Sequence, residues 1–333
     1  MPLIILRKTP SLRAPLSLLS TARRVSTPGP RPLRHDTTPK GAAAKRSFAT
    51  SSALCSNTRQ SVPDGRTAIV TGSSRGIGKA IALRLASDGY SVCVHDVPAN
   101  KAGCEEVVDE IRRMDGGGGE KRKACYALAD VSRRAEVDAL IKTSVEQLGP
   151  LDVMVANAGI AQVKPVLDIT EADLERMFRV NVLGLHNTYA AAARQMIAQK
   201  SCRPDRPGKI IGAASIAAFK PTPLLSHYTA SKFAVRGLTQ GFAVELAPHN
   251  ITVNAYAPGI VGTAMWDLID AEMARQHGVA KGEVLKKMVH DNTALGRVSV
   301  VEDVARLVSF LASSDSDFVT GQTQVVDGGI VYT

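Results

Sequence analysis

From residue 63 to the C-terminus, short runs of apolar and β-branched residues alternate with segments long enough to form helices. Strands and helices that alternate in this way form right-handed crossovers, which place the strands in one parallel sheet with helices on both faces. We therefore expect an α/β fold over residues 63–333, with a single doubly wound parallel sheet and a sizeable core. The expected strands are 67–71, 91–95, 123–127, 151–156, 209–213, 251–257 and 324–326.

The first 62 residues differ from the rest of the 333-residue chain. They hold 11 basic side chains and one acid, out of 41 and 31 in the whole chain, and they are rich in Ser, Pro and Ala. Such a segment is typical of an organelle presequence, so we expect residues 1–62 to be a disordered extension that directs import into the mitochondrial matrix. The alternative is a disordered basic tail without an address, on a cytoplasmic protein.

Charge and composition argue against several classes of protein. Residues 63–333 hold 30 basic and 30 acidic side chains, and the whole chain has 7 Phe, 6 Tyr and 1 Trp. We therefore expect neither a basic nucleic-acid-binding face nor a platform for stacking bases. No apolar run approaches the roughly 18 residues that span a bilayer, so we expect no membrane partner. The 5 cysteines lack metal-ligand spacing, which predicts reduced thiols and no metal site.

A glycine-rich turn, Gly72-Ser73-Ser74-Arg75-Gly76-Ile77-Gly78, directly follows the first expected strand. Without Cβ atoms the backbone can turn tightly and approach a pyrophosphate, whose charge then faces the free N–H groups at the start of the next helix. The spacing is G-x-x-x-G-x-G, and its context predicts a dinucleotide site in a Rossmann-like fold. A second glycine run, 116–119, is followed by no helix start and is expected to be a flexible loop.

Asp96 ends the second expected strand, 18 residues after Gly78. A carboxylate at this place accepts hydrogen bonds from the adenosine ribose hydroxyls and repels a 2′-phosphate. Arg75 favours the opposite choice, because a guanidinium pairs well with a 2′-phosphate. We give the carboxylate more weight and expect NAD as the cofactor, with NADP as the alternative.

Tyr228 and Lys232 stand four residues apart in a segment of helical periodicity, so we expect them on one helix face. A nearby ammonium favours a phenolate, so Tyr228 is expected to take up or release the proton. Ser215 follows the strand 209–213 and is expected at the sheet edge where such folds build their sites, in reach of a substrate carbonyl. His227 points away from Tyr228 and is expected to pack or to line the rim of the pocket.

These motifs, in this order, resemble those of the short-chain dehydrogenase/reductase family over about residues 65–333. The resemblance implies hydride transfer between an alcohol and a ketone with NAD(P), in a homodimer or homotetramer. It implies a catalytic set of Asn181, Ser215, Tyr228 and Lys232, with Asn181 holding a water that links Lys232 to solvent. The implied cofactor contacts are Gly72, Ser74, Arg75, Gly76, Ile77, Gly78, Asp96, Asp130, Val131, Asn157, Ala158, Gly159, Tyr228, Lys232, Pro258, Gly259, Ile260 and Thr263.

Residues 232–266, with the later LGR and SDSDFVTGQ, resemble the acetoin and diacetyl reductase (2,3-butanediol dehydrogenase) branch, and polyol dehydrogenases more loosely. This implies a small vicinal diol or hydroxyketone as substrate. Ile216 departs from that branch, where a polar Gln follows the catalytic serine, so one substrate hydrogen bond is in doubt. Residues 260–295 are expected to form a lid over the substrate, in which Trp266 either lines the pocket or anchors the lid or a subunit contact.

Two other functions stay open at this point. Arg75 and the basic tail favour an NADPH-dependent reductase of 3-ketoacyl thioesters in an organelle. A nucleotide-binding scaffold without catalysis is also compatible with the fold, because a fold does not dictate an activity. The intact set of Ser215, Tyr228 and Lys232 argues against the scaffold.

Overall fold

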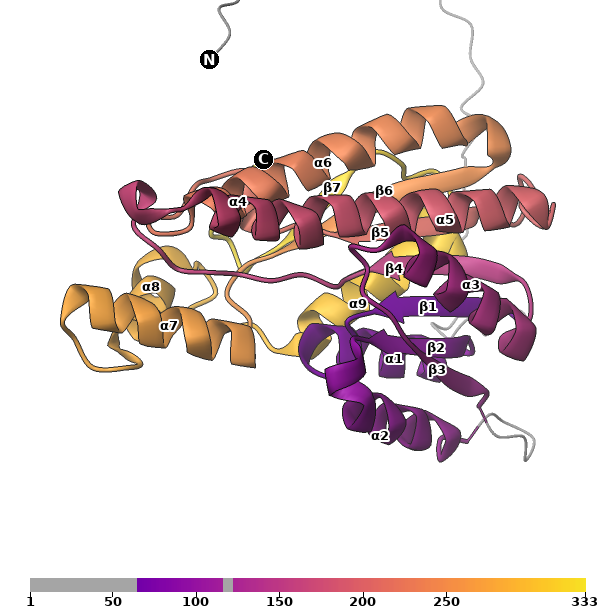
Figure 1. The fold of residues 1–333 in the computed structure, drawn as a ribbon, viewed down its shortest axis with the longest axis horizontal. Coiled ribbons are helices and arrows are strands. Elements are labelled where there is room, and N and C mark those ends of the chain that lie inside the picture. Colours follow the sequence, from indigo (N-terminus) through magenta and orange to yellow (C-terminus); the bar gives the residue numbers. More distant parts are fainter. Residues whose placement is uncertain (1–64, 116–121) are drawn as a thin grey trace, which may run out of the picture. The chain divides into compact units, whose positions relative to one another are not determined.

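The structure, a computed structural model, describes residues 65–115 and 122–333. In this part of the chain, seven strands form one parallel sheet in the order β3-β2-β1-β4-β5-β6-β7 (Figure 1). This confirms the expected fold class, and each expected strand is present. The expected extension 1–62 and the glycine run 116–119 lie outside the described residues. The strands are β1 (Thr67–Thr71), β2 (Ser91–Asp96), β3 (Ala124–Leu128), β4 (Leu151–Ala156), β5 (Gly208–Ala213), β6 (Ile251–Pro258) and β7 (Thr323–Val326).

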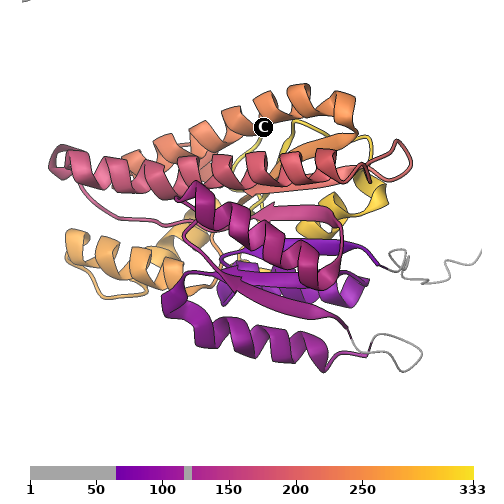
Figure 2. The ribbon, with the colours of Figure 1, turned by 45° about the vertical axis from the view of Figure 1, so that its right-hand side comes forward.

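Helices cover both faces of the sheet (Figures 1 and 2). On one face, apolar side chains of α3, α5 and α6 form a buried cluster with the strands, and on the other face α1, α2 and α9 do the same. Strands that are buried on both faces consist of continuous apolar runs, and these runs allow the strands to be recognised in the sequence. The helices are α1 (Gly76–Asp88), α2 (Lys101–Arg112), α3 (Arg134–Leu148), α4 (Glu171–Phe178), α5 (Leu185–Ala198), α6 (Ser226–Leu246), α7 (Ala264–His277), α8 (Glu283–Asn292) and α9 (Val301–Ala312).

The strand order has a switch point between β1 and β4. The chain builds β1, β2 and β3 outward in one direction, then returns to pair β4 with the other side of β1. The loops that leave β1 and β4 therefore diverge, and open α/β sheets bind ligands in the crevice that this creates at the carboxyl ends of the strands. The glycine turn follows β1 and Asn157 follows β4, so both lie at this crevice.

The helical segment that carries Asn181 is irregular. Between α4 and α5 the chain forms a π-helical stretch, η3 (Arg179–Gly184). Such stretches insert an extra residue into a helix and are frequent at functional sites.

In the described part of the chain, every helix is too short or too polar to cross a membrane. That part also holds no cluster of His, Cys, Asp or Glu side chains that would bind a metal ion.

Candidate active site

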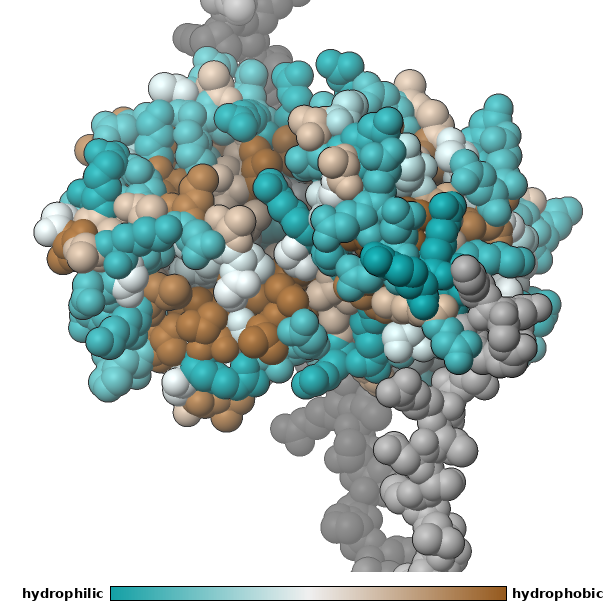
Figure 3. All heavy atoms as spheres, turned by 90° about the horizontal axis from the view of Figure 1, so that it is seen from below, coloured by the Kyte–Doolittle hydropathy of each residue, from teal (hydrophilic) through white to brown (hydrophobic). Residues whose placement is uncertain are grey.

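A cavity of about 1740 Å³ lies along the carboxyl ends of the strands. It is larger than the roughly 300–1,000 Å³ typical of a pocket for one small ligand. In the view from below, the surface is hollowed between the part formed by α7 and α8 and the rest of the molecule, and apolar side chains gather beside the hollow (Figure 3). The cavity has room for a dinucleotide and a small substrate together.

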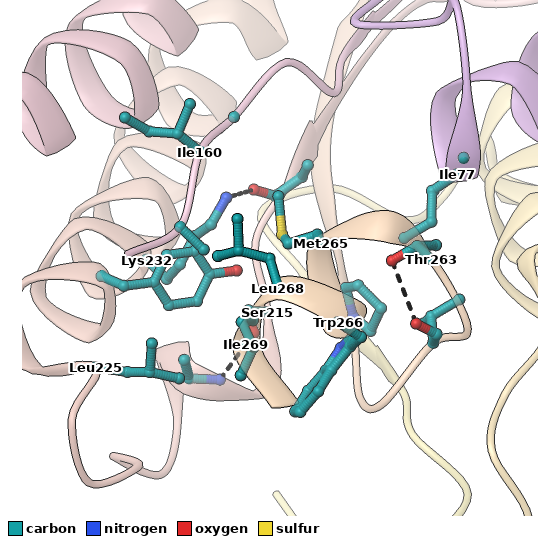
Figure 4. Close-up of a pocket in the computed structure, with 18 of the residues that line it drawn as sticks. Ile77, Ile160, Ser215, Leu225, Lys232, Thr263, Met265, Trp266, Leu268 and Ile269 are labelled. Carbon is teal, nitrogen blue, oxygen red and sulfur yellow. Dashed lines mark hydrogen bonds between the residues drawn. The ribbon is translucent and has the colours of Figure 1, made fainter. Parts of the chain in front are cut away.

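The three side chains expected to do the chemistry meet in this cavity. Tyr228 and Lys232 lie one turn apart on α6, and Ser215 follows β5. The Tyr228 hydroxyl is hydrogen-bonded with Ser215, and the Lys232 Nζ lies 5.5 Å from the centre of the Tyr228 ring. Figure 4 shows Ser215 and Lys232 lining the same cavity as Trp266 and Leu268 of α7.

Burial controls the protonation of this set. It raises the pKa of the Tyr228 phenol, and the hydrogen bond with Ser215 offsets part of that rise. It lowers the pKa of the Lys232 ammonium to about 8. The sequence led us to expect that the ammonium favours the phenolate; in the structure its Nζ donates to the Ala213 carbonyl at 2.8 Å, and burial dominates at Tyr228. The protein's own groups therefore keep the phenol protonated at neutral pH.

Asn181 lies beneath this site rather than in the cavity lining. Its Oδ1 accepts from the Ile160 N–H at 2.8 Å, and its Nδ2 donates to the Ile160 carbonyl at 2.9 Å and to the Ser231 hydroxyl at 3.1 Å. The side chain thus ties the π-helical stretch to the loop after β4 and to α6. Its expected role in holding a water stays a prediction.

The glycine turn has the backbone geometry that the sequence predicts. Gly72 and Gly76 have φ of 64° and 57°, which other residues rarely adopt. A Cβ on Gly78 would overlap the Gly72 carbonyl oxygen. The first turn of α1 can therefore pack directly on the turn, with its free N–H groups at the cavity.

Asp96 lies at the end of β2 with both carboxylate oxygens in hydrogen bonds. One accepts from the Ser74 hydroxyl at 2.5 Å, and the other accepts from the Val97 N–H at 2.8 Å and the Asn100 amide at 2.9 Å. Burial alone would raise the pKa of Asp96, but these donors outweigh it, so the pKa lies below its ordinary value. The carboxylate is ionised at neutral pH. Arg75 is exposed and lines the same cavity.

The structure brings the other expected cofactor residues to the same cavity. All of those expected from the resemblance line it except Ser74, which points instead to Asp96. The cavity-lining members beyond the glycine turn, Asp96, Tyr228 and Lys232 are Asp130, Val131, Asn157, Ala158, Gly159, Pro258, Gly259, Ile260 and Thr263.

Two buried side chains that sequence reasoning missed contact the machinery around the glycine turn. The His95 Nε2 donates to the Ala129 carbonyl at 3.1 Å, so its Nδ1 is free to accept from the Gly72 N–H at 3.4 Å. Burial lowers the pKa of His95 to about 4, which keeps the ring neutral. Tyr256 on β6 donates to Asn157. The only signal for either was a polar ring near the carboxyl end of an otherwise apolar strand.

Gln162, together with Lys164 and Asp173, forms a polar cluster near His227 that sequence reasoning also missed. The Gln162 amide donates to Asp173 at 2.8 Å, and its Oε1 accepts from the His227 Nε2 at 3.0 Å. Lys164 pairs with Asp173 at 2.6 Å. His227 is buried and its ring is hydrogen-bonded to Gln162, which agrees with the packing position expected for it.

The end of the cavity beside Tyr228 has a largely apolar lining and is bordered by a helical hairpin. The expected excursion 260–295 contains α7 and α8, and Trp266 of α7 lines the cavity. Asp270 is 3% exposed, and its carboxylate accepts from the N–H groups of Gly282 at 2.6 Å and Leu285 at 2.8 Å, which joins the two helices. Apolar side chains that line this end are Ile160, Val163, Ile216, Leu225, Ile269 and Met288.

Comparisons with known proteins agree with this architecture. The profile of the family described as short chain dehydrogenase matches residues 66–274. The L-2,3-butanediol dehydrogenase of Corynebacterium glutamicum is 48% identical over 269 residues, which cover 80% of this chain and 99% of that protein. An (S)-acetoin-forming diacetyl reductase of Staphylococcus epidermidis is 44% identical over 271 residues, with coverage of 80% and 99%. The crystal structure of a dehydrogenase/reductase from Sinorhizobium meliloti 1021 is similar with a TM-score of 0.70 and 34% identity, and covers 82% of this chain and 98% of that chain.

Proposed function

Because the chain belongs to the short-chain dehydrogenase/reductase family, we propose that it interconverts a small vicinal diol or hydroxyketone with the corresponding ketone, using NAD(H). Family membership makes it an oxidoreductase that acts on CH–OH groups with NAD(P). The substrate class and the choice of NAD are the proposal. The observation that carries it is the meeting of Ser215, Tyr228 and Lys232 in one cavity, beside an apolar compartment under α7 and α8.

The geometry suits a concerted transfer of hydride and proton. The nicotinamide, when bound, accepts or supplies the hydride and carries the positive charge of its oxidised form. Ser215 is placed to hydrogen-bond the substrate oxygen, and Tyr228 to exchange a proton with the same oxygen. In reduction, the phenol that burial keeps protonated donates to the developing alkoxide. Oxidation needs Tyr228 as the phenolate: once the phenol has lost its proton, its oxygen takes the alcohol proton as the hydride leaves carbon.

The apolar lining supports a small, uncharged substrate. Ile216 follows Ser215 and lines the cavity with Leu225 and Trp266. Such walls favour short alkyl groups on either side of a carbonyl. The two relatives named above act, by their names, on butanediol and on diacetyl.

The choice of NAD rests on Asp96. Its carboxylate is ionised and fixed at the end of β2, where it repels a 2′-phosphate. Arg75 on the same cavity favours the alternative, an NADPH-dependent reductase of 3-ketoacyl thioesters.

Steady-state kinetics test the proposal directly. Diacetyl, acetoin, the stereoisomers of 2,3-butanediol and an acetoacetyl thioester would be compared with NADH or NAD⁺ and with NADPH or NADP⁺. We expect the highest kcat/KM with a four-carbon hydroxyketone or diketone and NADH. Higher kcat/KM with the thioester and NADPH would replace the proposal with the alternative. Dinucleotide binding without turnover of any carbonyl would favour a scaffold.

Two further proposals concern the location and assembly of the protein. The composition of residues 1–62 supports import into the mitochondrial matrix, which fusion of this segment to a fluorescent protein tests.

Phe233 and Val244 are exposed apolar residues on the long helix α6, and they support a homodimer or homotetramer. Light scattering of the purified protein measures its mass, and a monomer would contradict this proposal.

A further inference from the structure

Tyr256 is a buried polar residue that the proposed chemistry does not use. It lies on β6, its side chain is 0% exposed, and it stands two residues before Pro258. Its hydroxyl donates to the Oδ1 of Asn157 at 2.7 Å. β6 borders the end of the cavity where the family places the nicotinamide, whereas Asn157 contacts the glycine turn. The hydrogen bond therefore links the nicotinamide end of the expected cofactor site to the turn that is expected to hold the pyrophosphate.

The same Asn157 amide group also forms hydrogen bonds with the glycine turn. With its oxygen bound to Tyr256, its Nδ2 donates to the carbonyls of Thr71 at 2.8 Å and Gly72 at 3.0 Å. A rotated amide would set its oxygen against two carbonyl oxygens, so the network permits one orientation. Tyr256 supplies the donor that this orientation requires.

The peptide groups on both sides of Gly72 are thereby held. The Gly72 N–H donates to the His95 Nδ1, and the Gly72 carbonyl accepts from Asn157. There is little free space around this residue, because a Cβ on Gly72 would lie 2.9 Å from the Ala158 Cα and 3.2 Å from the Asn157 Nδ2. The direction of the turn's N–H groups toward a pyrophosphate thus depends on how Asn157 is oriented.

We propose that Tyr256 is a positioning residue for the dinucleotide: acting through Asn157, it fixes the Gly72 peptide and with it the turn that binds the pyrophosphate. The inference rests on the dinucleotide cofactor that the family implies and does not depend on the substrate. Tyr256 itself contacts neither the reacting atoms nor the pyrophosphate in this role. Its loss is expected to weaken dinucleotide binding more than it slows the chemical step.

Tyr256→Phe tests this, and Tyr189→Phe is a matched control. Tyr189 is equally buried, and its hydroxyl pairs with the Thr239 hydroxyl at 3.2 Å in the core between α5 and α6, away from the glycine turn. Both variants remove one buried hydroxyl. The wild type and both variants would be titrated with NADH and with NADPH by fluorescence, without substrate. The Kd values of the three proteins would then be compared for the dinucleotide that the wild type binds more tightly.

We expect the dinucleotide Kd to rise roughly tenfold in Tyr256→Phe and to change less than about twofold in Tyr189→Phe. Hydrogen exchange of the peptide that spans 72–78 should be faster in Tyr256→Phe alone. An unchanged Kd in Tyr256→Phe, or an equal rise in both variants, would overturn the proposal. Because the titration needs no substrate, it stays informative if the proposed reaction is wrong.

Asn157→Asp covers the case in which Tyr256→Phe does not fold. It keeps an acceptor for Tyr256 and the size of the side chain but replaces the Nδ2 donor. The proposal requires a rise in Kd at least as large as that expected for Tyr256→Phe. A wild-type Kd in Asn157→Asp would contradict it.

Discussion

At the scale of single residues, burial sets the pKa values of the two ionisable side chains at the centre of the site. Tyr228 and Lys232 are four residues apart and share a cavity, yet burial shifts both toward their neutral forms. The sequence predicted which residues meet, because an i, i+4 pair on a helix must share a face. It did not predict the direction of the shift at Tyr228, because burial and the contact of Lys232 with the Ala213 carbonyl depend on the packing of α6 against the sheet.

Replacing Tyr228 by Phe should remove the proton-transfer group and little else. We expect kcat for carbonyl reduction to fall at least about a hundredfold, the range typical of a lost general acid. The dinucleotide Kd, measured by fluorescence, should stay within about threefold of wild type. Turnover close to wild type would exclude Tyr228 from the mechanism.

Lys232 should reduce stability at neutral pH. Its pKa in the folded protein is about 8, against an ordinary value of 10.5. Below pH 8 the folded state contains a buried ammonium, which lowers the free energy of unfolding. Between pH 8 and 10.5 Lys232 is protonated in the unfolded chain but neutral in the folded protein, so the free energy of unfolding rises with pH. Lys232→Met should therefore be more stable than wild type at pH 7 by about 2 kcal/mol, after its lost hydrogen bond is counted.

Urea unfolding of Lys232→Met and wild type at pH 7 and pH 10 measures this difference. The gap between the two proteins should be largest at pH 7 and shrink toward pH 10, while the variant loses activity. A variant that is less stable than wild type at pH 7 would show that burial of the Lys232 ammonium does not lower the free energy of unfolding.

Asp96 and Arg75 should act in opposite directions on cofactor choice. Asp96→Ala removes the ionised carboxylate and should lower the NADH to NADPH ratio of kcat/KM by about tenfold or more. Arg75→Ala removes the one exposed cation of the glycine turn and should raise that ratio. An unchanged ratio in both variants would place the selection elsewhere.

At the scale of helices and strands, regular burial was predictable and irregular backbone was not. All seven strands were predicted because each carries a short apolar or β-branched run. The five inner strands are buried along most of their length, and the edge strands β3 and β7 are only partly buried. The π-helical stretch at 179–184 has no comparable signal, and the hydrogen bonds of its Asn181 to Ile160 join segments that only the folded chain brings together. The region 260–295 was predicted as a lid, but its two helices and the buried Asp270 that joins them were not.

Asp270 should control the lid without contributing to the chemistry. Asp270→Ala leaves the N–H groups of Gly282 and Leu285 without their acceptor and should loosen the hairpin of α7 and α8. We expect the substrate KM to rise severalfold, the dinucleotide Kd to stay near wild type, and limited proteolysis to cut within 264–292. Asp291→Asn, an exposed acid of α8, is the control. Equal protease sensitivity in both variants would count against this role.

At the scale of the whole molecule, the sheet order explains why residues far apart in sequence form one site. The switch point between β1 and β4 opens the crevice, and loops after β1, β2, β4, β5 and β6 all reach it. The motifs predicted this gathering. The contact of Tyr256 with Asn157 spans 99 residues, and that of His95 with Gly72 spans 23. No local pattern marks either pair, because each needs the finished sheet to bring its members together.

A dinucleotide bound across this crevice should stabilise the whole fold, because it contacts loops from both halves of the sheet. At 100 times its Kd, a ligand that binds only the folded state adds about 2.7 kcal/mol to the free energy of unfolding. For a domain of this size we expect the Tm to rise by about 5–10 °C with NADH, measured by calorimetry. The same concentration of NADPH should raise the Tm less, since the Asp96 carboxylate opposes its 2′-phosphate. In Asp96→Ala the two shifts should converge, and a larger shift with NADPH than with NADH in wild type would reverse the proposed cofactor choice.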